Sequence, residues 1–178
     1  MTATDPQLAV LSYLAYSRSL QNSIDSESFG WEQQTGLVPP GGGFGFAAEV
    51  FKNGNDYVIA FRGTDFDLAN FAGAAVGLGD LATSMDAALG ARTEQLRRAI
   101  EVVARVQALP NVGTITLTGH SLGGGIASVM SVFFNLPAVT FATAPYELSA
   151  RNLVSDSISS VLGYFSVQDY YNHYLRYV

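Results

Sequence analysis

The sequence predicts an α/β fold, with a mainly parallel central sheet flanked by helices and an antiparallel hairpin before the motif-bearing strand. Short β-branched or aromatic runs alternate with longer stretches in which apolar residues recur at three- and four-residue spacing. Such alternation is typical of strand–helix–strand units, whose strands pair in parallel. The 178 residues show no internal repeat. They fit one domain with a substantial core, so we expect a single domain over 1–178.

The first elements expected are a helix and a hairpin. Apolar residues three and four positions apart predict a helix over 7–20. Residues 21–45 are more polar and end in the run PPGGG, which indicates irregular chain. Two apolar runs, 46–51 and 57–61, then flank the turn-forming group Asn53-Gly54-Asn55-Asp56 and predict an antiparallel hairpin. The second run, YVIAF, is almost wholly apolar, as expected of a strand covered on both faces.

The second half of the chain continues the alternation of helices and strands. The expected elements are a helix over 92–108 that ends before Pro110, a strand over 114–118, a helix over 122–135 and a strand over 136–142. The first of these helices carries one apolar stripe, with its charged residues elsewhere. This order is the basis for expecting a parallel sheet covered by helices.

Composition excludes several classes of function. Charged residues make up 13% of the chain, against about 25% in an ordinary soluble domain. A surface so poor in charge favours an apolar partner such as lipid, or cover by a further part of the protein. The nine basic residues are scattered and the formal net charge is −6, which argues against nucleic-acid binding.

No cofactor or metal site is expected. The chain has no cysteine, which excludes disulfides, cysteine-ligated zinc and cysteine nucleophiles. Its two histidines lack nearby carboxylates at a metal-binding spacing. The N-terminus has no basic stretch typical of a secretory signal, and no apolar segment approaches the roughly 20 residues that span a bilayer. Localisation stays open between the cytoplasm and export by another signal.

The motif that carries chemistry is Gly119-His120-Ser121-Leu122-Gly123, which fits G-x-S-x-G and lies between a β-branched strand and a helix-forming run. A serine in such a strained turn needs small flanking residues, because neighbouring backbone approaches closely. The Leu122 amide and the helix N-terminus would then stabilise a developing oxyanion. In the alternative interpretation, the glycines only allow helix–sheet packing and Ser121 caps the helix.

Three motifs in order resemble the class 3 lipases, the fungal-lipase-like branch of the α/β-hydrolases: FRGTD at 61–65, GHSLGGGIA at 119–127 and VTFATAP at 139–145. The resemblance extends over roughly residues 46–170. It implies an α/β-hydrolase fold and hydrolysis of acylglycerols, phospholipids or simpler esters. It also implies a Ser-Asp-His triad in that chain order, often beneath a mobile lid.

Residue by residue, the resemblance makes Ser121 the nucleophile. The amide of Leu122 becomes one donor of the oxyanion hole and Thr64 the second oxyanion residue. Thr64 can also be an ordinary turn residue at a strand end. His120 neighbours the nucleophile, but adjacent side chains in a sharp turn diverge, so we interpret it as a packing or hydrogen-bonding residue rather than the base.

The acid and the base are less clearly marked. Residues 164–169 fit a strand that delivers Asp169 as the acid, with Asp156 a weaker candidate and a solvated loop aspartate the alternative. The candidate base is His173, only four residues after Asp169, whereas the family's histidine lies well beyond the aspartate. Either His173 reaches the site by an unusual route, or the domain is incomplete at its C-terminus and the base lies beyond Val178.

The expected function is a serine hydrolase that cleaves carboxylic esters of lipid-like substrates and contacts a lipid interface transiently. The apolar, glycine-rich segment 66–90 is a candidate lid, in which Phe66, Leu68 and Phe71 would contact the substrate. A plain helical core explains that segment nearly as well. The alternative function is a catalytically impaired module that binds lipid or a partner, since fold does not fix function. An acyltransferase or thioesterase would differ only in acceptor or leaving group.

Overall fold

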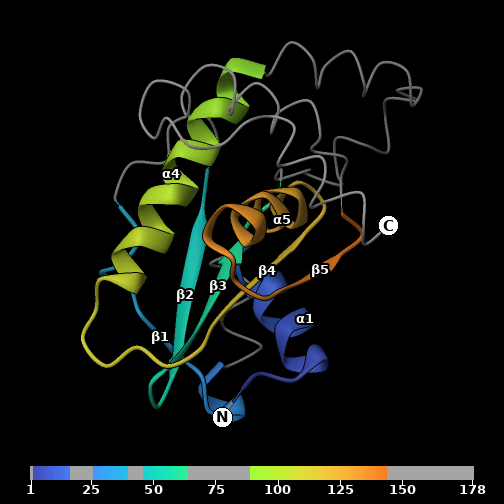
Figure 1. The fold of residues 1–178 in the computed structure, drawn as a ribbon. Coiled ribbons are helices and arrows are strands. Elements are labelled where there is room, and N and C mark those ends of the chain that lie inside the picture. The colour runs from blue at the N-terminus through green and yellow to red at the C-terminus, as the bar shows by residue number, and fades with distance from the viewer. Residues whose placement is uncertain (1, 17–25, 40–45, 64–88, 144–178) are drawn as a thin grey trace. The chain divides into compact units, whose positions relative to one another are not determined.

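A computed structural model of the chain describes residues 2–16, 26–39, 46–63 and 89–143. All of them belong to one unit, Met1–Pro145. The elements are the helices α1 (Asp5–Leu14), α4 (Leu89–Gln107) and α5 (Leu122–Phe134), the 3-10 turn η1 (Ser26–Phe29), and the strands β1 (Glu32–Gln33), β2 (Ala48–Asn53), β3 (Asp56–Phe61), β4 (Ile115–His120) and β5 (Ala138–Phe141) (Figure 1).

The strands form one mixed sheet in the order β1-β2-β3-β4-β5. The pairs β1–β2 and β2–β3 are antiparallel, whereas β3–β4 and β4–β5 are parallel. The predicted α/β fold is therefore confirmed, including the hairpin, whose two strands meet at the Asn53–Asp56 pair. Parallel pairing places the C-terminal ends of β3, β4 and β5 at the same edge of the sheet.

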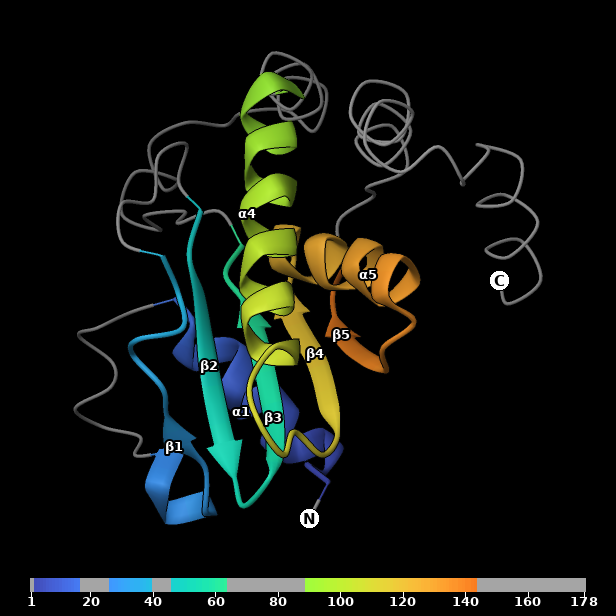
Figure 2. The same cartoon turned by 60° about the vertical axis from the view of Figure 1, so that its left-hand side comes forward.

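Helices cover both faces of the sheet. In Figure 2, α4 and α5 lie in front of the sheet and α1 behind it. On the α1 face, Leu8 and Leu11 belong to one buried cluster with Val58 and Ala60 of β3. The Thr118 hydroxyl donates to the Val139 carbonyl (2.8 Å) and lies 3.4 Å from the Leu8 carbonyl. The residues of β3 from Tyr57 to Phe61 are all buried, as predicted for a strand covered on both sides.

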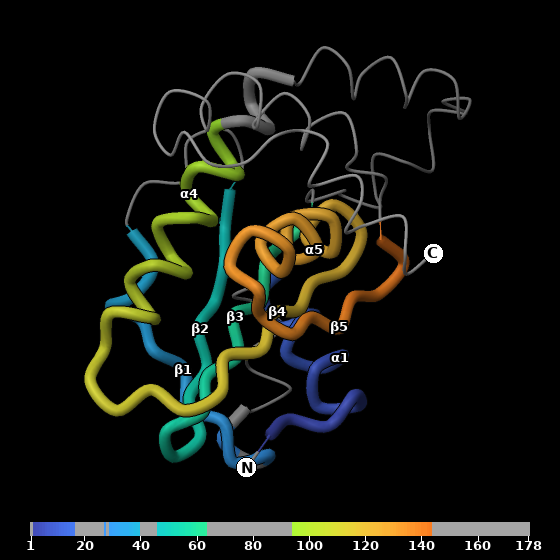
Figure 3. The backbone as a smooth tube through the Cα atoms, viewed as in Figure 1, coloured from blue at the N-terminus to red at the C-terminus, as the bar shows by residue number. Residues whose placement is uncertain are grey.

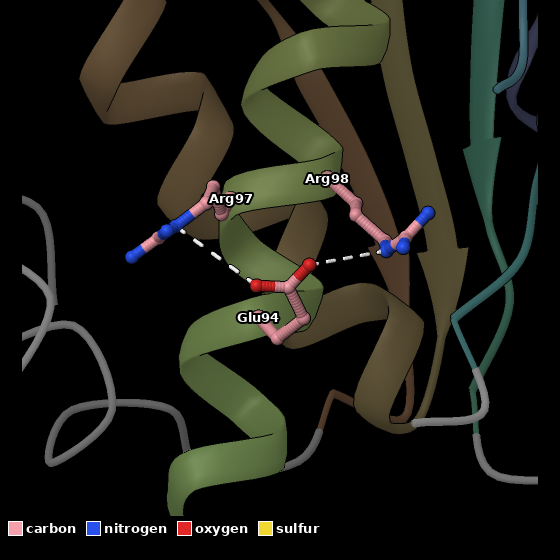
Figure 4. Close-up of polar contacts among 3 residues, drawn as sticks. All are labelled: Glu94, Arg97 and Arg98. Atoms are coloured by element: carbon pink, nitrogen blue, oxygen red, sulfur yellow. Dashed lines mark ion pairs between the residues drawn. The ribbon is translucent and has the colours of Figure 1, made fainter. Parts of the chain in front are cut away.

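The helix α4 presents a buried apolar stripe to the sheet and its charges to solvent. Leu96, Val103 and Val106 are fully buried. On its surface, Glu94 pairs with both Arg98 (3.3 Å) and Arg97 (4.0 Å) (Figure 4). Ion pairs three or four residues apart on a helix contribute about 0.2–0.5 kcal/mol each, so burial rather than charge holds α4 in place.

Two predicted segments differ from the structure at the N-terminal end. The helix expected over 7–20 begins earlier, at Asp5, because the Gln7 side chain accepts the Thr4 amide proton (3.0 Å) in a capping box. It ends at Leu14, and residues 17–20 lie outside the described part. Residues 21–45 were expected to be irregular, yet they include η1 and β1. A two-residue polar strand shows no periodicity in the sequence.

Residues 89–143 agree closely with the prediction, whereas the strand expected over 164–169 lies outside the described part of the chain. The helix expected over 92–108 is α4, and the strand expected over 136–142 is β5. The strand expected over 114–118 is β4, which continues two residues further, so only Ser121 separates it from α5. Figure 3 shows the chain passing from β4 into α5. In the described part of the chain, no helix is both long and apolar enough to cross a bilayer.

Candidate active site

Ser121 forms the bend between β4 and α5 in an unusual backbone conformation. Its φ is 54° and its ψ is −122°. Side chains clash with the backbone at such positive φ values, so residues other than glycine rarely adopt them. The cost is of order 1–3 kcal/mol and is tolerated where the surrounding structure enforces it. The serine of the motif is therefore a strained residue.

Neighbouring elements hold both main-chain groups of Ser121. Its N–H donates to the carbonyl of Phe141 at the end of β5 (3.0 Å), and its carbonyl accepts the N–H of Gly125 in the first turn of α5 (3.2 Å). These bonds fix the serine between a strand and a helix. The bend is thus built by the sheet and by α5, which is how the fold maintains the strain.

The glycines of the motif allow backbone to approach backbone. A Cβ on Gly119 would collide with the main chain of Gly123, and a Cβ on Gly123 would collide with the carbonyl of Phe61. The start of α5 therefore lies directly against the ends of β3 and β4. This close approach agrees with one part of the alternative interpretation. However, although Ser121 stands at the N-cap position of α5, its side chain makes no capping hydrogen bond to the helix.

The N-terminal turn of α5 places amides without a partner in the helix beside the serine. The first backbone hydrogen bond of the helix comes from Gly125, so the amides of Leu122, Gly123 and Gly124 have no partner within the helix. The helix dipole adds partial positive charge at the same end. Ser121 and Leu122 are both partly exposed. This arrangement can stabilise negative charge that develops next to the serine oxygen.

His120 interacts with the end of α1. Its ring lies edge-on to Tyr16, with 5.9 Å between centroids. The Tyr16 hydroxyl lies 3.1 Å from His120 Nδ1 and donates to the His120 carbonyl (3.0 Å). His120 therefore has the packing and hydrogen-bonding contacts that the sequence predicted. Sequence reasoning missed Tyr16, since no pattern links residues 104 positions apart.

Of the predicted site residues, the structure describes Ser121 and Leu122, which are adjacent at the bend. Thr64 directly follows Gly63, the last residue of the described FRG segment. A Cβ on Gly63 would lie 2.8 Å from the His120 carbonyl oxygen, so this segment reaches the sheet edge at which Ser121 lies. The other predicted site residues lie outside the described part of the chain: Thr64, Phe66, Leu68, Phe71, Asp169 and His173. The described residues include no cluster of three metal-binding side chains.

Comparisons with known proteins find one matching family and two similar proteins. A family model described as phospholipase-like, the Tle-like phospholipase domain, matches residues 11–162. A protein of Penicillium rubens named "Putative lipase atg15" is 40% identical over 57 residues, which are 32% of this chain and 8% of that protein. The crystal structure of a lipase from Rhizopus microsporus var. chinensis matches with 19% identity and a TM-score of 0.41, covering 80% of this chain and 60% of that one.

Proposed function

The chain belongs to a class 3 lipase-like family, that of the Tle-like phospholipase domain, and we propose that it is a serine hydrolase that cleaves carboxylic esters of lipid-like substrates. The observation that carries the proposal is the strained Ser121 beside the amides at the start of α5 that have no partner within the helix. Strain at a nucleophile is a recurrent feature of this type of bend. The substrate class, acylglycerol or phospholipid, is part of the proposal.

The proposed reaction proceeds through an acyl-serine. The Ser121 oxygen attacks the ester carbonyl carbon while a base takes its proton, and the carbonyl electrons move onto the oxygen. Amides of Leu122 and Thr64 stabilise that oxyanion. The C–O bond to the alcohol then breaks, the base returns the proton to the leaving alcohol, and water hydrolyses the acyl-serine in the same way. Asp169 orients the base.

The proposed substrate contact lies in the segment 66–90, of which residues 66–88 lie outside the described part of the chain and the last two begin α4. This segment combines apolar residues and glycines with little charge. In the proposal it acts as a lid over the acyl chain, with Phe66, Leu68 and Phe71 as the contacting side chains. An apolar lid fits a substrate presented at a lipid surface.

A fluorophosphonate probe tests the function directly. The Ser121 oxygen should attack phosphorus, form an O–P bond and release fluoride. The phosphorus of the probe takes the place of the ester carbonyl carbon, and an activated serine is sufficient for this reaction. Mass spectrometry of the digested protein should find the adduct on the peptide that contains Ser121. Heat-denatured protein is the control and should remain unlabelled. A folded protein with an inert serine would favour the lipid-binding module over the enzyme.

Replacing the candidate base, His173, tests the triad. If His173 takes the serine proton, His173→Ala should lower kcat by at least about 10⁴-fold, the order seen when a triad member is removed. Added imidazole should restore part of the rate. His120→Ala should lower kcat far less, because the His120 ring contacts Tyr16 and is not the proposed base. Wild-type turnover by His173→Ala would assign the base to another group.

A further inference from the structure

The hydroxyl of Tyr16 lies at the point where two segments lead into the proposed active site. It donates to the main-chain carbonyl of His120, directly before Ser121. It also occupies the space next to Gly63, directly before Thr64, where an added Cβ would collide with it. One side chain, two residues beyond the end of α1, therefore touches the backbone that precedes both the proposed nucleophile and the proposed second oxyanion residue.

The peptide unit between His120 and Ser121 is held at both ends. Its carbonyl oxygen accepts the Tyr16 hydroxyl proton (3.0 Å), and its N–H donates to the Phe141 carbonyl (3.0 Å). A peptide unit is planar, so two bonds on opposite sides fix its orientation. The φ angle of Ser121 is measured from that plane. Holding the plane therefore helps to hold Ser121 at its strained φ of 54°.

The main chain of Tyr16 is anchored to α1. The Tyr16 main-chain N–H donates to the Tyr13 carbonyl (3.0 Å) in the last turn of α1, and α1 is packed on the sheet through the buried Leu8 and Leu11. The contacts of the Tyr16 hydroxyl with His120 Nδ1 and with the His120 carbonyl are compatible when Nδ1 carries a proton. In that case the ring donates to the Tyr16 oxygen, while the Tyr16 proton goes to the His120 carbonyl.

We propose that Tyr16 is a positioning residue, which sets the conformation of Ser121 by fixing the His120–Ser121 peptide plane. It acts through the backbone and touches neither substrate nor reacting atoms. The inference rests on the proposed function, because it concerns the same serine.

The test is Tyr16→Phe, which keeps the ring against His120 and removes only the hydroxyl. Loss of this hydrogen bond should lower kcat for ester hydrolysis by roughly five- to tenfold with KM unchanged, and slow fluorophosphonate labelling by the same factor. Tyr13→Phe is the matched control. Tyr13 lies in the last turn of α1, three residues before Tyr16, and is 46% exposed, so that variant should match the wild type in both measurements.

Amide hydrogen exchange gives a second measurement that does not depend on activity. In Tyr16→Phe, the Ser121 amide should exchange roughly five- to tenfold faster than in the wild type. The Leu117 amide of β4, which is bonded to the Pro137 carbonyl, should keep its rate. Faster exchange of both amides would mean general destabilisation and would overturn the positioning role.

Two kinetic outcomes would also overturn it: wild-type kcat and labelling in Tyr16→Phe, or a raised KM with unchanged kcat. Failure of the proposed function itself is recognised separately with Ser121→Ala. If Ser121→Ala is inert while Tyr16→Phe behaves as the wild type, only this inference fails. If Ser121→Ala hydrolyses esters at the wild-type rate, the proposed function fails and the inference with it.

Discussion

Replacing Ser121 with alanine should lower kcat for ester hydrolysis by at least about 10⁴-fold, since a triad without its nucleophile keeps only the contribution of the oxyanion donors and of binding. The main-chain bonds of Ser121 to Phe141 and Gly125 do not use the side chain, so the fold should survive the change. The measurement is release of fatty acid from a phospholipid and an acylglycerol dispersion, with loss of fluorophosphonate labelling as the second readout.

Ser121→Gly is the matched control for the strain at this position. It also lacks the nucleophile and should be equally inactive. Glycine adopts a φ of 54° without a Cβ clash, whereas its greater conformational entropy in the unfolded chain lowers stability. The net effect should make the glycine variant more stable than the alanine variant by about 1 kcal/mol. Denaturant unfolding measures the difference. Equal free energies of unfolding for the two variants would contradict strain at Ser121. An active Ser121→Ala variant would show that Ser121 is not the nucleophile.

The bend at Ser121 could be predicted from sequence because its causes are local. Five consecutive residues contain the serine and the two glycines, and the strand and helix on either side follow from short patterns. The hairpin is similar, because Gly54-Asn55 lies between two apolar runs and sets their pairing. In both cases a few neighbouring side chains determine the backbone.

Features that depend on distant contacts could not be predicted in the same way. Tyr16 contacts His120 only because α1 packs against β4. No residue near Tyr16 in the sequence indicates that packing. Trp31 is buried beside β1, but a single aromatic residue does not identify a two-residue strand. The roles of Asp169 and His173 depend on tertiary contacts of this kind and stay predictions.

Gly123→Ala should destabilise the protein by at least about 2 kcal/mol, the upper part of the range for overpacking a tight contact. The added Cβ would collide with the carbonyl of Phe61 and lie 2.8 Å from the carbonyl carbon of Arg62. Both are backbone atoms of the sheet edge, which cannot rotate away as a flexible side chain can. The higher helix propensity of alanine offsets only about 1 kcal/mol of the clash. Denaturant unfolding gives the free-energy change.

Gly36→Ala is the control for adding a methyl group to a glycine. Nothing lies within 4 Å of a Cβ built on Gly36, so its free energy of unfolding should change by no more than about 0.5 kcal/mol. If Gly123→Ala had the same free energy of unfolding as Gly36→Ala, α5 would not lie as close to β3 as described.

The destabilisation by Gly123→Ala should come with a loss of activity in the molecules that still fold. To accommodate the methyl group, either α5 moves away from the sheet or the end of β3 moves away from α5. The first displacement carries the Leu122 amide with it, and the second carries the Phe61–Gly63 segment that leads to Thr64. Either way the two proposed oxyanion donors separate. Since removal of one such donor costs roughly 10²–10³ in kcat, the folded fraction should lose activity of that order.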